Sequence, residues 1–365
     1  MCLTGIPSRM PRSKGLFVVI QQIYYPALCV FGLPANLFTA YMIQFQKCGM
    51  SKTAGIYLTS LAIMDFFCLL WGALIDLSLY WLQGYTFWNR EPWCGLLTVM
   101  EYGAMFSSIW IIVAFTIERY LVLRSTHARQ QHSESAITVK IVFGVIVTSH
   151  LIGVPSFWIN EVLVGNFTSG NETKALPQCT YKDDAYATVV VWLHTFIQGG
   201  IPFSLIMVFN FLLGYELHKA GKMFTKEQKK AMNVIGRKGV VTRTMLLLLT
   251  VSFTFVALCL PRFVTYCILR TIYNTPNHDR NDYKQLINVF ADIGIMLQYL
   301  NSAINFLLYC VVSKQFRFAF WTLLSCKGRI KQRKSLASQL TSNIFAVIEK
   351  KSEQTKETSL HETST

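Results

Sequence analysis

Charged residues are scarce in this chain of 365 residues. Asp, Glu, Lys and Arg make up 15% of the sequence, whereas soluble globular proteins carry about 25%. Hydrophobic residues reach 52%, and the missing charge is concentrated in long uncharged stretches. The apolar surface must therefore face lipid, which excludes an ordinary cytoplasmic enzyme.

Motifs for catalysis and metal binding are also lacking. The sequence has no HExxH, no GxSxG and no Walker loop, and these are the short patterns that carry hydrolytic or phosphate chemistry. Its 10 cysteines occur singly, without CxxC pairs or histidines at ligand spacing. We therefore expect neither an enzyme, nor a zinc site, nor a dense disulfide framework.

Negative charge is the minority sign. The formal net charge is +15, which in a soluble protein would suggest a nucleic-acid partner. Here the basic residues lie in short segments between apolar runs, as on the rim of a membrane protein. We expect a lipid bilayer and no nucleic acid as a partner.

Seven apolar runs are long enough to cross a bilayer, which takes about 20 helical residues. They lack the alternation of a membrane barrel, and backbone groups in lipid must be satisfied internally, so we expect helices. The fold class predicted is an all-α membrane protein, a seven-transmembrane helix bundle with a short amphipathic eighth helix. The runs extend approximately over Val18–Phe45, Gly55–Leu82, Pro92–Leu123, Ile137–Ile159, Ala187–Leu217, Val240–Arg270 and Lys284–Val311.

The chain divides into four parts by composition. Residues 1–17 form a short basic N-terminal segment without a cleavage site, so we expect the first span to be an uncleaved anchor. Residues 18–311 hold the seven runs. Residues 312–326 have apolar side chains at helical spacing, and 327–365 are rich in Ser, Thr, Lys and Glu, which predicts a disordered tail.

Orientation follows from the basic residues. Most of the 34 Lys and Arg residues lie on the side that includes the C-terminus, which predicts a cytoplasmic C-terminus and an extracellular N-terminus. Locally, the three bases before the first run against two after it favour the reverse. Two glycosylation sequons, at Asn166 and Asn171, lie in a loop that this topology places outside.

A few ionisable residues lie at membrane depth, where they usually face the bundle interior. Asp65 needs polar partners, and with hydroxyl and amide oxygens it would form either a cation site or a hydrogen-bonded packing contact. Glu118-Arg119-Tyr120 closes the third run, where a charged pair could be a simple interfacial anchor. The other ionisable residues within the runs are Asp76, Glu101, His150, His194, Arg262 and Asp292.

The order and spacing of several motifs resemble the rhodopsin-like G-protein-coupled receptors. These motifs include Gly32-Leu-Pro-Ala-Asn36, Ser60-Leu-Ala-Ile-Met-Asp65, Cys94, Pro202, Pro261 and Asn301-Ser-Ala-Ile-Asn305. Within that family the chain is most similar to the orphan-type receptors that sense aromatic amino acids. Thr116-Ile-Glu-Arg-Tyr120, Pro261-Arg262 and Leu300-Asn-Ser-Ala-Ile-Asn-Phe-Leu-Leu-Tyr-Cys310 carry this finer match.

The resemblance implies roles for particular residues. Cys94 would pair with Cys179 in a disulfide. Glu118, Arg119, Tyr120 and Tyr309 would serve coupling to a heterotrimeric G protein, and Ile109, Pro202 and Phe255 would form the packing triad that relays ligand binding. The family's sodium pocket would consist of Asp65, Ser108, Asn301, Ser302 and Asn305, which favours the cation interpretation for Asp65.

The resemblance also implies a plasma-membrane location, with arrestin and receptor kinases as partners of the tail. Cys326 follows the short helix at a depth suited to acylation, and an unmodified thiol is the alternative. The chain departs from the family at Cys259, Phe306 and Asn210, and Val241 stands where an acidic partner for the family's Arg is usual. We therefore expect some basal activity.

Glu101 and Arg262 suggest the ligand. An acid and a base that face one cavity suit a zwitterion, with Glu101 binding an ammonium and Arg262 a carboxylate. The alternative is a purely structural ion pair. The resemblance aligns Glu101, Arg262 and His194 with positions that the aromatic-amino-acid receptors use for ligand contact. His194 is otherwise a packing histidine. We expect an aromatic wall from Tyr102, Phe106, Phe263 and Tyr266.

Other ligands and functions stay open at this stage. Ile295 is apolar where the group has another ligand contact, so a peptide or another small molecule is an alternative to an amino acid. An opsin-like light sensor is excluded, because no Lys lies between Gln285 and Val311 to hold retinal. A membrane transporter or channel with a seven-helix bundle is the alternative class, although no internal repeat or broken helix pair supports it.

Overall fold

The structure is a computed structural model. It describes residues 16–46, 48, 50–74, 87–124, 135–169, 172–223, 237–273, 278–280 and 282–325. Asn171, Cys326, the N-terminal residues 1–15 and the tail 327–365, about which the sequence made predictions, lie outside the described residues, as does the side chain of Asn166.

Long helices dominate the fold, as predicted. Six helical stretches are long and apolar enough to cross a membrane, and a pair bent by 55° makes up to seven. The bounds are α1 Leu16–Phe45, α2 Lys52–Cys68 with η1 Leu69–Ala73, α4 Trp93–Arg124, α6 Ser135–Gly153 with η3 Val154–Ile159, α7 Ala185–Thr195 with η4 Phe196–Gly200 and α8 Ile201–Met223, α10 Arg237–Thr271, and the bent pair α11 Leu286–Ala303 and α12 Asn305–Val312.

The helices begin and end close to the predicted bounds. The second is described as far as Leu74, so the predicted end at Leu82 lies outside the described residues. A serine begins this helix: the Ser51 side chain caps α2 by accepting from Ala54 N at 3.2 Å, an arrangement that satisfies one of the free N–H groups of a first turn.

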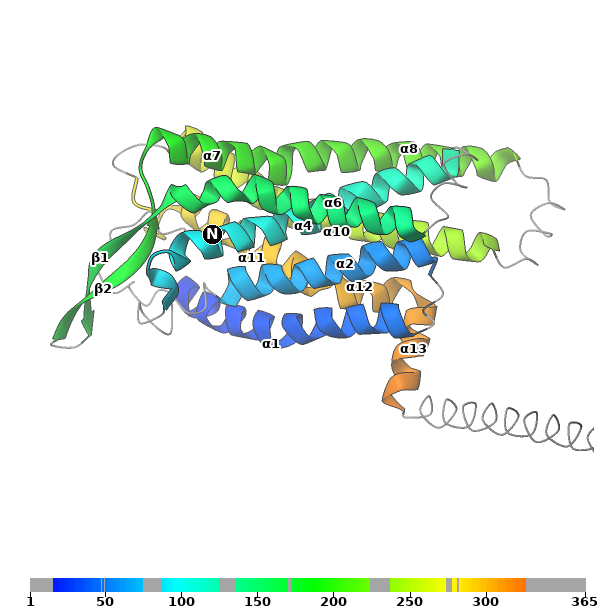
Figure 1. The fold of residues 1–365 in the computed structure, drawn as a ribbon, viewed down its shortest axis with the longest axis horizontal. Coiled ribbons are helices and arrows are strands. Elements are labelled where there is room, and N and C mark those ends of the chain that lie inside the picture. The colour runs from blue at the N-terminus through cyan, green and yellow to red at the C-terminus, as the bar shows by residue number, and fades with distance from the viewer. Residues whose placement is uncertain are drawn as a thin grey trace, which may run out of the picture. The chain divides into compact units, whose positions relative to one another are not determined.

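The helices of residues 16–313 pack lengthwise (Figure 1). α4 contacts α2, α6 and α8, while α11 contacts both α1 and α10. In the most apolar part of α4, 72% of the residues are buried inside the protein, against 22% for α6. α4 is therefore the central helix, and α6 presents large apolar side chains such as Phe143 and Leu151 outward, as lipid contact requires.

The bend between α11 and α12 coincides with a polar contact from another helix. Asn36 Nδ2 in α1 donates to the Ser302 carbonyl at 2.7 Å, and both residues are buried. A side chain that occupies a carbonyl of the helical ladder is a recognised cause of a kink. This contact ties the start of the bundle to its last span.

The described residues Lys314–Leu324 form α13, a helix that belongs to a separate unit. Apolar side chains recur along it, with Phe318 and Trp321 exposed at 74% and 62%. The expected short helix after the seventh span is therefore present, and large exposed apolar side chains suit a helix that lies in a membrane interface.

A β-hairpin was not predicted by the sequence. β1 Asn160–Ser169 pairs antiparallel with β2 Glu172–Tyr181 at the end of the bundle where α4 begins (Figure 1). The Cys94–Cys179 disulfide joins α4 to β2, with 5.7 Å between the two Cα atoms. The predicted pairing is confirmed, and Asn166 lies on β1.

We expect loss of this disulfide to impair folding. The two cysteines are 85 residues apart, and closing a loop of this size restricts the unfolded chain by about 4 kcal/mol in the entropic description. Cys94→Ala and Cys179→Ala should each lower surface expression several-fold, and the double variant should be no worse than either. Surface biotinylation measures the effect.

Cys267→Ala is the matched control, because this thiol is partly exposed and belongs to no disulfide. Additive losses from Cys94→Ala and Cys179→Ala, or an equal loss from the control, would contradict a shared bond.

Candidate functional site

The helix α4 carries one buried charged residue of the predicted ligand site and one of the predicted G-protein-coupling site, far apart along its axis. Glu101 and Arg119 are separated by about five turns, or about 27 Å. Both are buried, at 0% and 7% exposure. Burial of an unpartnered charge is costly. Each of these two residues therefore needs hydrogen-bond partners inside the bundle.

Glu101 and Arg262 each have a partner on α11. Tyr299 Oη donates to Glu101 Oε1 at 3.0 Å, and Arg262 Nη1 donates to Gln298 Oε1 at 2.5 Å. A Cβ on Gly294 would lie 2.8 Å from Arg262 Cα, so α10 and α11 approach closely at this point. Two consecutive residues of α11 thus hold the acid from α4 and the base from α10.

Two glutamines and a methionine line the layer beneath Glu101. The side-chain amides of Gln198 and Gln298 both donate to Met105 Sδ, and Met105 lies one helical turn from Glu101 on the same face of α4. Through Gln298, this layer connects to Arg262. These residues and Tyr299 were not predicted as site residues. Polar side chains inside apolar runs could have indicated them, since such residues usually face the bundle interior.

The predicted aromatic wall is divided into two groups. Tyr102 and Phe106 contact the His194 ring at centroid distances of 4.8 and 5.1 Å, and Tyr266 packs against the same cluster. Phe263 instead contacts Phe196 and Phe203, at 5.9 and 5.8 Å. Among the predicted aromatic residues, two therefore contact His194, Tyr266 packs on the same apolar cluster, and Phe263 lies against η4 and α8.

His194 is held in place by the backbone. Its Nε2 lies 3.0 Å from the Ile152 carbonyl, which requires the proton on Nε2. Nδ1 is buried and has no hydrogen-bond partner among the described residues. The structure therefore shows a packing role for His194, and its role as a ligand contact stays a prediction.

Asp65 is at the centre of the bundle and fully buried. Ser108 Oγ donates to its Oδ1 and Asn305 Nδ2 to its Oδ2, both at 2.6 Å. Asn301 and Ser302 are buried in the same part of α11. The structure thus brings together α2, α4 and α12 at one carboxylate.

The C-terminal end of α4 holds Arg119. Its Nε donates to Glu118 Oε2 at 2.6 Å, and its Nη2 donates to Thr53 Oγ1 in α2, also at 2.6 Å. Tyr120 contacts the Phe209 ring at 5.6 Å, and Tyr309 is fully buried. Thr53 was not predicted, since a threonine at a helix start is usually read as a cap.

The residues of the predicted triad lie in the apolar interior. Phe255 is fully buried, Ile109 is exposed by 4%, and the Phe255 ring lies 5.4 Å from Phe203, the residue after Pro202. Along α4, Ile109 lies between Glu101 and Arg119. Packing in such an interior can link the two ends of the bundle.

Comparison with known proteins assigns the family. The model of the 7 transmembrane receptor (rhodopsin family) matches residues 35–309. The chain belongs to this family of receptors. It is therefore a multi-pass plasma-membrane protein, a rhodopsin-like receptor and not an enzyme, whose family implies an extracellular ligand and coupling to a G protein.

Individual relatives are distant but cover most of the chain. The receptor is 28% identical over 313 residues to "Probable G-protein coupled receptor 142" of Mus musculus, a match that covers 85% of this chain and 74% of the relative. It is 23% identical to human neuromedin-U receptor 2, with coverages of 86% and 74%. Identity with the human B1 bradykinin receptor is 22%, with coverages of 86% and 84%.

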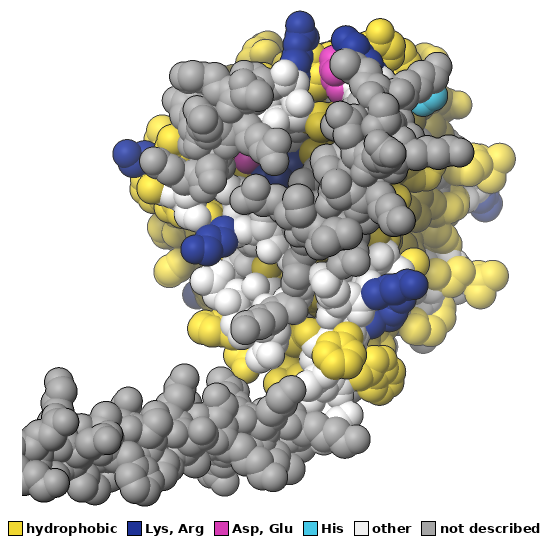
Figure 2. Space-filling view, turned by 90° about the vertical axis from the view of Figure 1, so that its right-hand side faces the viewer, with side chains coloured by type: hydrophobic (Ala, Val, Ile, Leu, Met, Phe, Trp, Pro, Cys, Tyr) yellow, Lys and Arg dark blue, Asp and Glu magenta, His cyan; other side chains and the backbone are white. Residues whose placement is uncertain are grey.

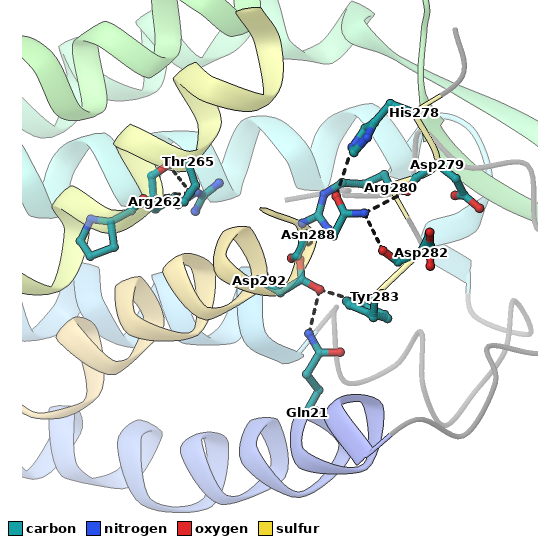
Figure 3. Close-up of polar contacts among 11 residues, drawn as sticks. Gln21, Arg262, Thr265, His278, Asp279, Arg280, Asp282, Tyr283, Asn288 and Asp292 are labelled. Atoms are coloured by element: carbon teal, nitrogen blue, oxygen red, sulfur yellow. Dashed lines mark hydrogen bonds and ion pairs between the residues drawn. The ribbon is translucent and has the colours of Figure 1, made fainter. Parts of the chain in front are cut away.

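The end of the bundle where α11 begins carries a polar cluster that the sequence did not predict (Figure 3). Asp292 in α11 is exposed by 4% and forms an ion pair with Arg280, which precedes α11. Tyr283 Oη and Gln21 Nε2 in α1 donate to its Oδ2 at 2.6 and 3.0 Å. This cluster, termed the outer latch, joins α1, the segment before α11 and α11 itself.

Asn288 reinforces the outer latch from within. Its Nδ2 donates to the Asp279 and Asp282 carbonyls, both at 2.9 Å, and Arg280 Nη1 donates to its backbone carbonyl at 3.2 Å. A buried amide with several backbone partners holds a loop in one conformation. The signal available in the sequence was only a group of polar residues beside an apolar run.

We expect the outer latch to stabilise the receptor. Asp292→Asn removes the charge that Arg280 and Tyr283 bind, and the partly buried Arg280 would lose its counterion, so the free energy of unfolding should fall by about 2–3 kcal/mol. Thermal denaturation of the detergent-solubilised receptor measures this loss.

Asp183→Asn is the matched control, because Asp183 has an exposed side chain outside this cluster. The role of the outer latch is wrong if both substitutions change the midpoint of denaturation equally.

Proposed function

We propose that the receptor binds a small zwitterion of the aromatic amino-acid type between Glu101 and Arg262. The observation that carries this proposal is a buried carboxylate and a guanidinium on two different helices, each bound to a neutral residue of α11. A ligand ammonium can replace the Tyr299 hydroxyl at Glu101, and a ligand carboxylate can replace the Gln298 amide at Arg262. Both exchanges substitute a charge-assisted hydrogen bond for a neutral partner.

The aromatic part of the ligand would contact Tyr102, Phe106, His194 and Tyr266. These residues provide ring faces and a hydroxyl beside the charged pair, which favours an aromatic side chain over an aliphatic one. Phe263 would act indirectly, through Phe196 and Phe203.

A peptide is the second candidate ligand. Two relatives are named as receptors for neuromedin U and for bradykinin, and Ile295, buried against Tyr25 and Leu28 of α1, supplies no polar contact for an amino acid. A peptide terminus or side chain would use the same two charges.

We propose that the N-terminus is extracellular and the C-terminus cytoplasmic. In Figure 2, which shows the end of the bundle where α1 ends and α2 begins, coloured Lys and Arg side chains are spaced around the rim. Basic residues favour the cytoplasmic side. The opposite end holds the disulfide, which forms in an oxidising compartment, and the sequons Asn166 and Asn171 are proposed glycosylation sites.

We propose that Arg119, with Glu118, Tyr120 and Tyr309, couples the receptor to the G protein at that cytoplasmic end. Ile109, Pro202 and Phe255 would relay ligand binding through the apolar layer. Arrestin and receptor kinases would act on the Ser- and Thr-rich tail, and Cys326 would carry an acyl chain that anchors the segment after α13.

Sodium binding at Asp65 fits the residues present. One carboxylate with Ser108, Asn301, Ser302 and Asn305 supplies hard oxygen donors. The Asn305 amide nitrogen faces the carboxylate here, so a cation requires the amide to turn and present its oxygen. The ion would supply one positive charge at a buried carboxylate, and Asp65 and Ser108 would hold it.

Agonist recognition is tested by removing one charge at a time. Glu101→Gln and Arg262→Gln should each reduce the potency of an aromatic amino acid about 10- to 100-fold, because a hydrogen bond to a charged group is lost. Arg262→Lys keeps the charge without the planar fork and should fall in between. Calcium and cyclic-AMP signals in cells with equal surface expression measure potency.

Glu161→Gln is the control, since this carboxylate lies on β1 and is partly exposed. Unchanged potency in both Glu101→Gln and Arg262→Gln would refute the site. Activation by peptide pools alone, sensitive to the same substitutions, would favour the peptide.

The cation site is tested by exchanging sodium for choline. We expect sodium to reduce agonist affinity in the wild type, and Asp65→Asn to abolish that dependence because it removes the only carboxylate of the set. Ser108→Ala should weaken it. Ser107→Ala should not, since its hydroxyl donates to the Gly103 carbonyl on the same helix. Sodium dependence that survives Asp65→Asn would place the ion elsewhere.

A further inference from the structure

We propose that Thr53 is a positioning residue that restrains Arg119 and thereby keeps basal signalling low. The Thr53 hydroxyl accepts a hydrogen bond from Arg119 Nη2 at 2.6 Å, and both residues are buried, at 7% exposure. This contact joins α4 to α2. The inference rests on the G-protein coupling proposed for Arg119.

The second partner of Arg119 does not tie it to another helix. Glu118 binds Nε at 2.6 Å and Nη2 at 3.0 Å, but it is the preceding residue of the same helix. Any shift of the inner end of α4 carries Glu118 and Arg119 together, so this pair does not oppose the shift. Among the described residues, the hydrogen bond to Thr53 is the one that ties the guanidinium to another helix.

The sequence of α10 leaves this restraint to α2. Between Arg237 and Thr271 there is no Asp or Glu, so α10 offers no carboxylate to pair with Arg119. In the hydrogen bond between Thr53 and Arg119 only the guanidinium is charged, whereas both groups are charged in a pair of arginine and carboxylate. The hydroxyl is therefore a weaker restraint than a carboxylate would be. A contact of this strength allows Arg119 to leave this position readily.

A second residue of α2 strengthens the same contact. Tyr57, one turn after Thr53, stacks on Phe115 with 5.0 Å between the ring centroids, and the Arg119 guanidinium carbon lies 5.2 Å from the centroid of the same Phe115 ring. Arg119 is therefore held by the Thr53 hydroxyl and by a ring that α2 supports. The first two turns of α2 therefore position the Arg119 side chain.

The start of α2 is fixed, so that Thr53 is presented in one position. Ser51 Oγ caps the helix through Ala54 N at 3.2 Å and lies 3.3 Å from Thr53 Oγ1. A capped first turn frays little. To reach a partner outside the bundle, Arg119 must give up the bond to Thr53, and a residue that binds only one of two states shifts the equilibrium toward that state.

The experiment compares basal G-protein activation in full-length receptor variants. Thr53→Val keeps the shape and removes the hydroxyl, and it should raise ligand-independent nucleotide exchange about tenfold, the change that follows from losing about 1.4 kcal/mol of bias. Thr53→Ser keeps the hydroxyl and should restore the wild-type level. Membranes with equal receptor content are assayed against a panel of G proteins.

Thr59→Val is the matched control, because Thr59 lies on the same helix and its buried hydroxyl has no hydrogen-bond partner in the described structure. It should leave basal exchange unchanged. If Thr53→Val does not reach the membrane, Thr53→Ala gives the same comparison without the added methyl group.

The outcomes separate this inference from the function on which it rests. Basal exchange that is unchanged in Thr53→Val and Thr53→Ala, or equally raised in Thr53→Ser or Thr59→Val, overturns the role of the hydroxyl. If no variant stimulates any G protein, with or without an agonist, coupling itself is refuted.

Discussion

Polar groups inside a lipid-embedded bundle must find their partners within the protein, and this constraint shapes the receptor. Water is absent from the bilayer core, so each unsatisfied polar group costs several kcal/mol, on the order of the values for transfer into hydrocarbon. The last span meets this demand for several helices at once. Its residues Asp292, Gln298, Tyr299, Ser302 and Asn305 bind partners on α1, α10, α4, α1 and α2, respectively.

The helices α11 and α12 carry contacts to both proposed sites. Gln298 and Tyr299 bond to the two charges of the proposed ligand site, and Asn305, six residues after Tyr299, bonds to Asp65. A ligand that displaced the first two contacts would change the bonding of the helix pair that also carries the third. Coupling of this kind would require the pair to have two arrangements that both sites bias.

The inner site follows a different principle. Arg119 is bound by its neighbour Glu118 and by Thr53, so its position depends on the relation between α4 and α2 and not on the last span. The departure of Val241 from the family pattern suggested weak restraint of this arginine. The structure adds a restraint from α2 that the sequence did not suggest, because the usual partner was sought on α10.

The sequence alone determined the class, the number of spans and the residues that could carry charge into the membrane. Long uncharged runs allow few structures other than helices. The resemblance to the receptor family implied the pairing of Cys94 with Cys179, and the structure confirmed that pairing. The sequence could not decide which polar residues meet. The sequence suggested that Glu101 and Arg262 face one cavity, and the structure shows that Tyr299 bonds to Glu101 and Gln298 to Arg262.

The hairpin, the outer latch and Thr53 also emerged only from tertiary structure. The outer latch and the Thr53 contact depend on the rotation and tilt of helices that are distant in the chain, as in the contact of Gln21 with Asp292. Periodicity fixes which face of a helix is apolar, but on a buried helix nearly every face is apolar, so it specifies no neighbour. Partners were therefore decided by packing, in which each polar group bonds to whatever the neighbouring helix presents at the same depth.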